Sequence, residues 1–326
     1  MNLSRRSVLA LGAAFCSARA VAQAGRSWRI GFLAQIARPE PFGPHIFGTL
    51  ARSLGQLGYV EGRNLAMDWR FANGDVPALP RLAAELAAQK LDVVVTAGPL
   101  SAVAMRKATT TMPVVFGNVP DPVGAGLVQS FSRSGTNMTG VANLSGTMMP
   151  KLMELALEAV PRASRIALLV NPQQPSHARM PTILATQVAK LPVRLTAYPA
   201  AWPSEIDGAF DAIARDGADL VLIPLEGLFI QQRAQIGALA LRYRVPAAGL
   251  DEELSGHGAL LTYGADQHVM FRKVAGFVDR VLRGTAPQDL PVEQASDYVL
   301  VVNRTVESAL RLQVPPALLI RADRVI

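Results

Sequence analysis

The sequence predicts an α/β protein with two Rossmann-like lobes, each built on a parallel sheet and joined by a hinge. One observation is a strand, loop, helix, strand unit within residues 91–124. A β-branched run at residues 93–96 stops at Gly98 and Pro99, apolar residues then recur at helical spacing, and Pro113 begins a second apolar run. Because the first strand has no polar alternation, both of its faces are expected to be covered, as in a parallel sheet with helices on each side.

A second unit of the same kind begins at Asp219. There an apolar strand is followed by a helical segment at residues 228–243 and by a new strand after Pro246. The match suggests two α/β halves, although any two strand-helix-strand units share this much, so an internal duplication remains one of two alternatives. The length of 326 residues also favours two domains, because a single core rarely grows beyond roughly 250–300 residues.

The composition is that of a globular chain. Hydrophobic residues make up 50% and charged residues 17%, which excludes intrinsic disorder. Basic residues stand singly or in pairs, without an arginine-rich run or a basic helix, so no nucleic-acid partner is expected. Beyond the N-terminus no segment reaches roughly 18 uninterrupted apolar residues, the length that a membrane-spanning helix needs.

The N-terminus has the pattern of a cleavable export signal. Arg5 and Arg6 precede an apolar stretch at residues 8–15, and a small-residue cleavage site ends at Ala24. We expect cleavage to remove residues 1–24. The paired arginines suit a twin-arginine (Tat) signal and an ordinary Sec signal equally, so both routes stay open. Either route predicts a soluble periplasmic protein.

The only cysteine, Cys16, lies within this signal. The mature chain is therefore expected to have no disulfide and no thiol chemistry. The signal also contains three arginines. Removing them from the 32 basic residues leaves 29 against 25 acidic ones, so the net charge falls from +7 to about +4.

The other elements follow from hydrophobic periodicity and from breaks at Pro and Gly. The further strands are expected at residues 30–33, 65–71, 139–143, 166–170, 193–197, 259–263 and 298–303. The further helices are expected at residues 43–58, 79–91, 148–160, 181–190, 204–216, 269–282 and 305–312. No long linker or low-complexity segment separates them.

The chain is expected to pass between the lobes more than once. The first lobe is predicted to contain residues 25–143 and about 264–295, and the second lobe residues 144–263 and about 296–326. The late crossing is predicted at residues 263–265, where Gly264 can absorb a backbone rotation. Two or three such crossings would form a hinge.

The sequence has no catalytic or metal-binding constellation. No histidine has zinc-ligand spacing to a second His or Cys, so no metal is expected; the four are His45, His177, His257 and His268. No serine has the flanking glycines of a nucleophile elbow. Gly124 and Gly126 begin a dinucleotide fingerprint whose third glycine is missing, and there is no phosphate loop, so no cofactor is expected.

Several segments together resemble the periplasmic substrate-binding proteins of ABC transporters, in the branch that includes tryptophan- and tyrosine-binding proteins. They are GFLAQ, LDVVVTAG, MPVVF, DPVGAGLV, IALLVNP, LLTYGAD, PVEQASDYVLVVN and VPPALLIRADRVI. The resemblance implies a type I periplasmic-binding fold that closes on its ligand, a membrane permease as partner, and no enzymatic activity. One loop departs from the pattern, since Gly98, Pro99 and Leu100 stand where a more polar sequence is expected.

The ligand is expected to be a small organic carboxylate with an apolar or aromatic body, and the resemblance favours an amino acid. The candidate binding residues lie at or near strand ends, where α/β proteins bind ligands. They are Gln35, Gly98, Leu100, Ser101, Asn118, Asp121, Asn171, Glu226, Asp251 and Tyr263. Phe116 and Phe229, with Tyr263, are candidates for the apolar wall, although core packing is the alternative role for each.

A helix beginning after Gly98 suggests how a carboxylate is held. The backbone N–H groups of Leu100, Ser101 and Ala102 would point into the cleft, with the Ser101 hydroxyl beside them. Asn118 and Asp121 could take an amino group, and Glu226 and Asp251 would approach from the other lobe. The alternative is that Ser101 only caps its helix and that the acids are solvated.

Two other classes of function remain to be weighed. An exported α/β enzyme could use Asp121, Glu226 or Asp251 as acid or base, but the sequence shows no paired arrangement. A sugar-sensing transcription regulator with the same lobes would carry a DNA-reading helix pair at its N-terminus, where this chain has an export signal.

Overall fold

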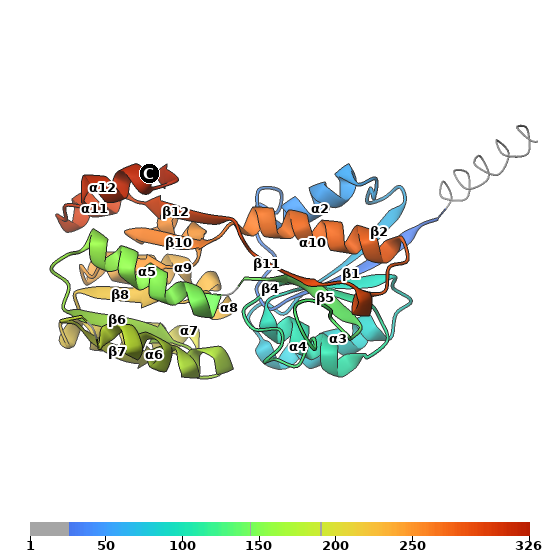
Figure 1. The fold of residues 1–326 in the computed structure, drawn as a ribbon, viewed down its shortest axis with the longest axis horizontal. Helices are drawn as coiled ribbons and strands as arrows, with labels where there is room; N and C mark the ends of the chain where they lie inside the picture. Colours follow the sequence, from blue (N-terminus) through green and yellow to red (C-terminus); the bar gives the residue numbers. More distant parts are fainter. Residues whose placement is uncertain (1–25, 144, 190) are drawn as a thin grey trace, which may run out of the picture.

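The computed structural model describes residues 26–143, 145–189 and 191–326. The expected export signal, residues 1–24, lies outside the described residues. Two lobes of similar architecture lie side by side, each with a central sheet between layers of helices (Figure 1). We call them the first and the second lobe in order of their first strands.

The first lobe contains a six-stranded sheet in the order β11-β5-β4-β3-β1-β2, in which every neighbouring pair is parallel. Its strands are β1 (Trp28–Ala34), β2 (Leu65–Phe71), β3 (Val93–Ala97), β4 (Val114–Val119), β5 (Met138–Ala142) and β11 (Val292–Gln294). Its helices are α2 (Ile46–Gln56), α3 (Leu79–Ala87), α4 (Pro99–Ala108) and α10 (Gln267–Leu282), with the short turns η1 (Val76–Ala78) and η3 (Pro287–Asp289).

Apolar side chains on both faces of this sheet explain its burial. Val93 and Val95 point to one face, with Phe47 of α2 and Phe271 of α10. The neighbouring Val94 points to the other face, where α3 and α4 pack. The continuous β-branched run therefore serves two cores, as expected for a parallel sheet covered on both sides.

The second lobe contains a seven-stranded sheet in the order β13-β12-β10-β9-β8-β6-β7. Only the β10–β12 pair is antiparallel among its described pairs. The strands are β6 (Arg165–Val170), β7 (Arg194–Pro199), β8 (Leu220–Ile223), β9 (Ala247–Gly249), β10 (Leu261–Ala265), β12 (Tyr298–Val302) and β13 (Arg324–Val325).

Eight helical segments accompany this sheet along the described chain. They are α5 (Ser145–Ala159), α6 (Pro175–Val188), α7 (Pro203–Arg215), α8 (Gly227–Gln231), α9 (Arg233–Arg242), η2 (Glu252–His257), α11 (Arg304–Leu310) and α12 (Pro316–Arg321). One core joins the sheet to α5, α6, α11 and α12, and another joins it to α7, α8 and α9. Each lobe thus has a core on both faces of its sheet.

The chain crosses between the lobes three times: between β5 and α5, between β10 and α10, and between β11 and β12 (Figure 1). The second crossing was expected at residues 263–265. These residues instead complete β10 and pair with β12, Gly264 opposite Val299, so the crossing lies at Asp266. Gly264 is needed for packing, because a Cβ there would lie 2.2 Å from the Leu250 carbonyl oxygen.

Most expected elements are present, with some differences. The helix expected at residues 228–243 is two helices, α8 and α9, because Gln232 leaves helical geometry with φ −98° and ψ 20°. The short strands β11 and β13 and the helix α12 were not expected. Strands of two or three residues carry too little periodicity to be recognised from sequence.

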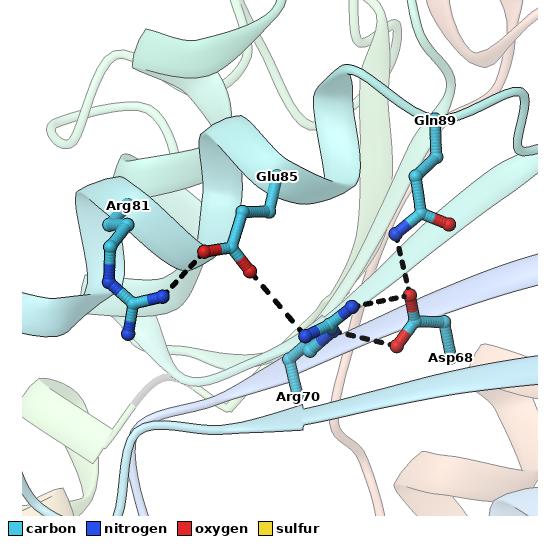
Figure 2. A network of polar contacts seen from close by, with 5 residues as sticks. All are labelled: Asp68, Arg70, Arg81, Glu85 and Gln89. Carbon is cyan, nitrogen blue, oxygen red and sulfur yellow. Dashed lines mark hydrogen bonds and ion pairs between the residues drawn. The ribbon is translucent and has the colours of Figure 1, made fainter.

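A polar network holds the edge strand β2 against α3 (Figure 2). Arg70 Nε donates to Asp68 Oδ1 at 2.7 Å, and Gln89 Nε2 donates to Asp68 Oδ2 at 2.6 Å. Arg70 also bridges to Glu85 of α3 at 3.4 Å. Burial would raise the pKa of Asp68, but the hydrogen bonds from Arg70 and Gln89 outweigh it and lower that pKa. The network keeps charged groups on a strand edge that could otherwise pair with another chain.

None of the helices formed by residues 26–143, 145–189 and 191–326 combines the length and apolar character that a membrane span requires.

Candidate functional site

A cavity of about 90 Å³ lies between the lobes, where the carboxyl ends of strands from both sheets meet. Because one ordered water needs roughly 10–15 Å³, this space holds a small organic molecule better than a single water. The residues that follow β1, β3 and β4 line it from the first lobe, and those that follow β8 and β9 line it from the second. We call it the main cavity.

Aromatic and aliphatic side chains form one wall of the main cavity. Phe47 of α2 and Phe271 of α10 come from the first lobe, and their rings meet edge to face at 5.6 Å. Ile36 and Ile46 adjoin them, and Ile230 of α8 faces them from the second lobe. This wall can cover an apolar or aromatic group, because such rings pack favourably edge to face or offset.

Three helices of the first lobe begin at the main cavity. Their first residues, Ile46 of α2, Pro99 of α4 and Gln267 of α10, all line it. The first N–H groups of a helix have no partner within the helix, and its dipole makes this end positive. His45 and Asp266 cap α2 and α10, and α4 has no side-chain cap, so the start of α4 is the place on the first-lobe side that most favours a negatively charged ligand group.

Acidic side chains of the second lobe face these helix ends. Glu226, Asp251, Glu252 and Glu253 line the main cavity, together with Arg233. Arg233 Nε donates to Asp251 Oδ2 at 3.1 Å, and its guanidinium also pairs with Glu253. Burial raises the pKa of Asp251, and Arg233 opposes that rise. The excess of acids makes the second-lobe side favourable for a cationic group.

Glu226 is the acid with spare hydrogen-bonding capacity. It is 3% exposed, and its Oε2 accepts from the Leu228 N–H at 2.8 Å, which caps α8. Its Oε1 is buried and has no hydrogen-bond partner. Burial raises its pKa, and the nearby amides of Asn171 and Gln35, with the backbone N–H groups of Leu228 and Phe229, oppose that rise without cancelling it. A ligand N–H donor would satisfy the free oxygen.

His45 lies at the border between the lobes. Its Nδ1 accepts from the Phe47 N–H at 3.2 Å and so caps α2. Burial lowers its pKa to about 4; the nearby Glu253 carboxylate, across the cleft, raises it, and Arg233 lowers it. His45 is therefore neutral near pH 7 and acts as a hydrogen-bond acceptor there.

The described residues bring five of the ten candidate binding residues to the main cavity: Gln35, Gly98, Asn118, Glu226 and Asp251. Leu100 and Asn171 line a second cavity beside it, to which Gln35 and Glu226 also contribute. Ser101, Asp121 and Tyr263 line neither of these two cavities.

Local structure explains why those three residues lie elsewhere. The Ser101 side chain is fully buried, and the Ala102 N–H, expected to be free, donates to the Gly98 carbonyl at 3.2 Å. Asp121 Oδ1 accepts from the Gly124 N–H at 2.8 Å and holds a turn. Tyr263 packs beside Tyr298, with the ring centres 5.9 Å apart. All three side chains are thus engaged elsewhere in the fold and do not line either cavity.

The expected aromatic wall is also different. Phe116 and Phe229 line neither cavity: Phe116 packs in the core of the first lobe, and Phe229 stacks on His177 with the rings 6.0 Å apart. Phe47 and Phe271 form the wall instead. They come from helix starts rather than strand ends, and α10 joins the first lobe only after the chain has crossed back, so sequence order gives no signal for Phe271.

No group of three or more His, Cys, Asp or Glu side chains able to hold a metal ion occurs within residues 26–143, 145–189 and 191–326.

Comparison with known proteins agrees with this architecture. The family model described as ABC transporter substrate binding protein matches residues 44–326. The tyrosine-binding protein of Clostridioides difficile (strain R20291) is 24% identical over 262 residues, which are 80% of this chain and 75% of that protein. Both the family and this relative are binding proteins rather than enzymes.

Two solved structures share the fold. A conserved domain protein from Vibrio cholerae O1 biovar El Tor has a TM-score of 0.86 and 26% identity, covering 92% of this chain and 100% of that one. The ABC domain of a Streptococcus pneumoniae protein in complex with L-Trp has a TM-score of 0.83 and 21% identity, with the same coverage. The type I periplasmic-binding fold expected from the sequence is confirmed. The chain belongs to the family of ABC transporter substrate-binding proteins.

Proposed function

We propose that this substrate-binding protein works in the periplasm and captures an amino acid with an apolar or aromatic side chain for an ABC uptake system. The observation that carries the proposal is the distribution of charge around the main cavity. Three helix N-termini face it from the first lobe, and four acids face it from the second. A zwitterion matches such a site, because each of its charged ends meets the opposite sign.

The ligand carboxylate would lie at the start of α4. Gly98 and Pro99 line the main cavity, and the N–H groups of the next residues are at the free end of the helix. Pro99 has no N–H group, but this costs no hydrogen bond within the helix, since the first N–H of a helix has no partner there. No arginine is required for this carboxylate, and the cavity's own Arg233 is already paired with two acids.

The ligand ammonium would lie against Glu226. Oε1 of this buried carboxylate has no partner, and a charged donor would remove the cost of that isolation. Asn118, whose backbone φ is +63° and whose Oδ1 accepts from the Asn143 amide at 2.5 Å, adjoins from the first lobe. The side chain of the ligand would then pack against Phe47 and Phe271.

The aromatic wall supports a larger apolar side chain over a small one. The tyrosine-binding relative and the L-Trp complex support the same ligand class, although neither fixes the ligand of this chain. Export by a Tat or Sec signal within residues 1–24, and delivery to a membrane permease, complete the proposal. N-terminal sequencing of the protein recovered from the periplasm would test the expected cleavage after Ala24.

Calorimetry on purified residues 25–326 tests the ligand class. We expect at least one apolar or aromatic L-amino acid to bind, and its analogues without the amino group or without the carboxylate to bind at least about thirtyfold more weakly, as loss of a buried charge partner costs 2 kcal/mol or more. Binding of a sugar with no response to any amino acid would contradict the proposal. So would equal affinity for an amino acid and its decarboxylated analogue.

A further inference from the structure

A second cavity of about 110 Å³ adjoins the main one between the lobes. It lies where β1 and β2 of the first lobe end and where β6 and β7 of the second lobe end. Gln35 and Glu226 line both cavities, so the two spaces share these side chains. We call this space the outer cavity.

The outer cavity is lined by carboxamides. Six amide side chains contribute to it: Gln35, Asn73, Asn171, Gln173, Gln174 and Gln231. Glu226 is the one ionisable side chain among its described lining residues, and it lies on the side shared with the main cavity. Trp202, which is 44% exposed, adds an aromatic surface.

Two polar side chains of the outer cavity have hydrogen-bonding capacity to spare. Gln174 is 6% exposed and stands at the N-cap position of α6, yet its side chain does not cap the helix. Its amide makes no hydrogen bond to any residue that the structure describes. Glu226 Oε1 is likewise buried without a partner. Native proteins rarely leave a buried atom such as Glu226 Oε1 unpaired, and a bound ligand is one of the ways in which it becomes paired.

We propose that the outer cavity is a second compartment of the binding site, which takes a neutral hydrogen-bonding group, of the carboxamide or peptide type, carried by the same ligand. This inference rests on the proposed function, since the amino-acid part of the ligand occupies the main cavity. Carboxamides donate and accept at once and pair with an amide of the ligand in either direction. A charged extension would find no counter-ion there except Glu226, which the ligand ammonium already uses.

The ligand that fits both compartments is longer than a single aromatic amino acid. Its ammonium lies at Glu226, which both cavities share, and its carboxylate lies at the start of α4. In a dipeptide the peptide group lies between these two charged ends, at the border that Glu226 forms with the outer cavity, where the carboxamides of Gln174 and Gln231 can pair with it. A dipeptide that contains an aromatic residue has this size and chemistry.

Calorimetry with three probes tests the inference: L-tyrosine, glycyl-L-tyrosine and L-tyrosylglycine, where the two dipeptides cover both directions of extension. We expect at least one dipeptide to bind the wild-type protein ten times more tightly than L-tyrosine. In Gln174→Leu this gain should fall to less than threefold, while the affinity for L-tyrosine stays unchanged. Gln187→Leu, on the exposed face of the same helix α6, is the matched control and should keep the gain.

Two results would overturn the inference. Dipeptides that bind no more tightly than L-tyrosine would show that the outer cavity adds no contact to the ligand. A gain that survives in Gln174→Leu would show that its source lies elsewhere. Failure of all three probes and of every other apolar or aromatic L-amino acid, in a protein whose melting temperature is normal, would reject the amino-acid ligand itself, and so separates failure of the proposed function from failure of the second compartment.

Discussion

Gly227 of the second lobe lies directly against Gln35 of the first lobe. A Cβ on Gly227 would come within 2.7 Å of both Cδ and Oε1 of Gln35, so the absence of a side chain allows the two lobes to meet. A similar contact joins Gly74 of the first lobe to Gln231 of the second, where a Cβ would lie 2.7 Å from Oε1. Two glycines thus permit close approach along one side of the cleft, beside the cavities.

The first prediction concerns closure of the lobes. Gly227→Leu places a bulky side chain at the contact with Gln35, so we expect a ligand affinity at least tenfold weaker and a radius of gyration that stays at its unliganded value when ligand is added. The Gly227 backbone lies outside the left-handed region, so the variant should fold normally. Calorimetry and small-angle scattering measure the two effects.

Gly208→Leu is the matched control for this change. Gly208 lies within α7, and a Cβ there meets nothing within 4 Å. The ligand affinity of Gly208→Leu should equal that of the wild type. If Gly227→Leu binds as tightly as this control, the lobes close on the ligand without the contact between Gly227 and Gln35.

The second prediction concerns Glu226. Glu226→Gln retains an oxygen that can cap the Leu228 N–H but removes the charge, so affinity for an amino acid should fall at least about thirtyfold. The ligand-free protein should become more stable at pH 7, by roughly 1 kcal/mol or more, because a buried carboxylate without a cation is costly. Calorimetry measures the loss of ligand affinity, and urea unfolding measures the gain in stability.

The sign of the pH effect follows from the raised pKa of Glu226. The folded state holds this proton more tightly than the unfolded state, so the stability of the ligand-free protein falls as pH rises from about 4.5 through the raised pKa. Glu226→Gln should flatten that part of the profile. Glu154→Gln, on the exposed surface of α5, should leave both stability and affinity unchanged. A less stable Glu226→Gln protein would show that the carboxylate has a cationic partner in the unliganded state.

The third prediction concerns acid sensitivity through His45. Burial holds its pKa near 4 against 6.5 in an exposed site, so the unfolded state binds this proton more readily between those values. Stability should therefore fall as pH is lowered from 6.5 toward 4, by less than the roughly 3 kcal/mol that the full change would give, since the side chain is partly exposed. His45→Asn keeps an acceptor at the cap and should reduce this loss.

The buried His177, whose pKa is also lowered to about 4 by burial, will add its own loss over the same pH range. The comparison is therefore made between His45→Asn and the exposed His257→Asn, both of which retain His177. Chemical denaturation at pH 4.5 and pH 7 provides the two stabilities. If stability falls equally between pH 7 and pH 4.5 in both variants, His45 does not contribute to acid sensitivity.

The sequence is enough to predict the two lobes and half of the candidate site. Both predictions rest on the recognition of buried strands. Asn118 lies near the end of the buried strand β4, and Gln35, Glu226 and Asp251 follow buried strands; the carboxyl ends of parallel strands converge at one edge of a sheet. Strand order therefore predicts their convergence without any knowledge of helix packing. The division of the chain between two sheets follows from the same periodicity.

Residues whose role depends on local hydrogen bonding or on helix packing could not be placed in this way. Asp121 follows a strand as Glu226 does, but a turn uses its carboxylate. Phe271 reaches the cavity only because α10 packs on the first sheet, next to α2 and far from it in sequence. Periodicity shows which face of a helix is apolar but not which sheet that face covers.

The last prediction concerns Ser101, which was expected to contact the ligand carboxylate. Its hydroxyl is buried inside α4, away from both cavities, and has no hydrogen-bond partner. Ser101→Ala removes an unsatisfied polar group and introduces a better helix former, so the free energy of unfolding should rise by about 1 kcal/mol. Amino-acid affinity should not change, because the helix offers the ligand its backbone N–H groups rather than this side chain. Ser308→Ala, at an exposed position of α11, measures the contribution of helix propensity alone and should be the smaller of the two gains. Urea unfolding and calorimetry decide the matter: weaker binding by Ser101→Ala would place the hydroxyl on the ligand, and a loss of stability would show that it has a partner within the fold.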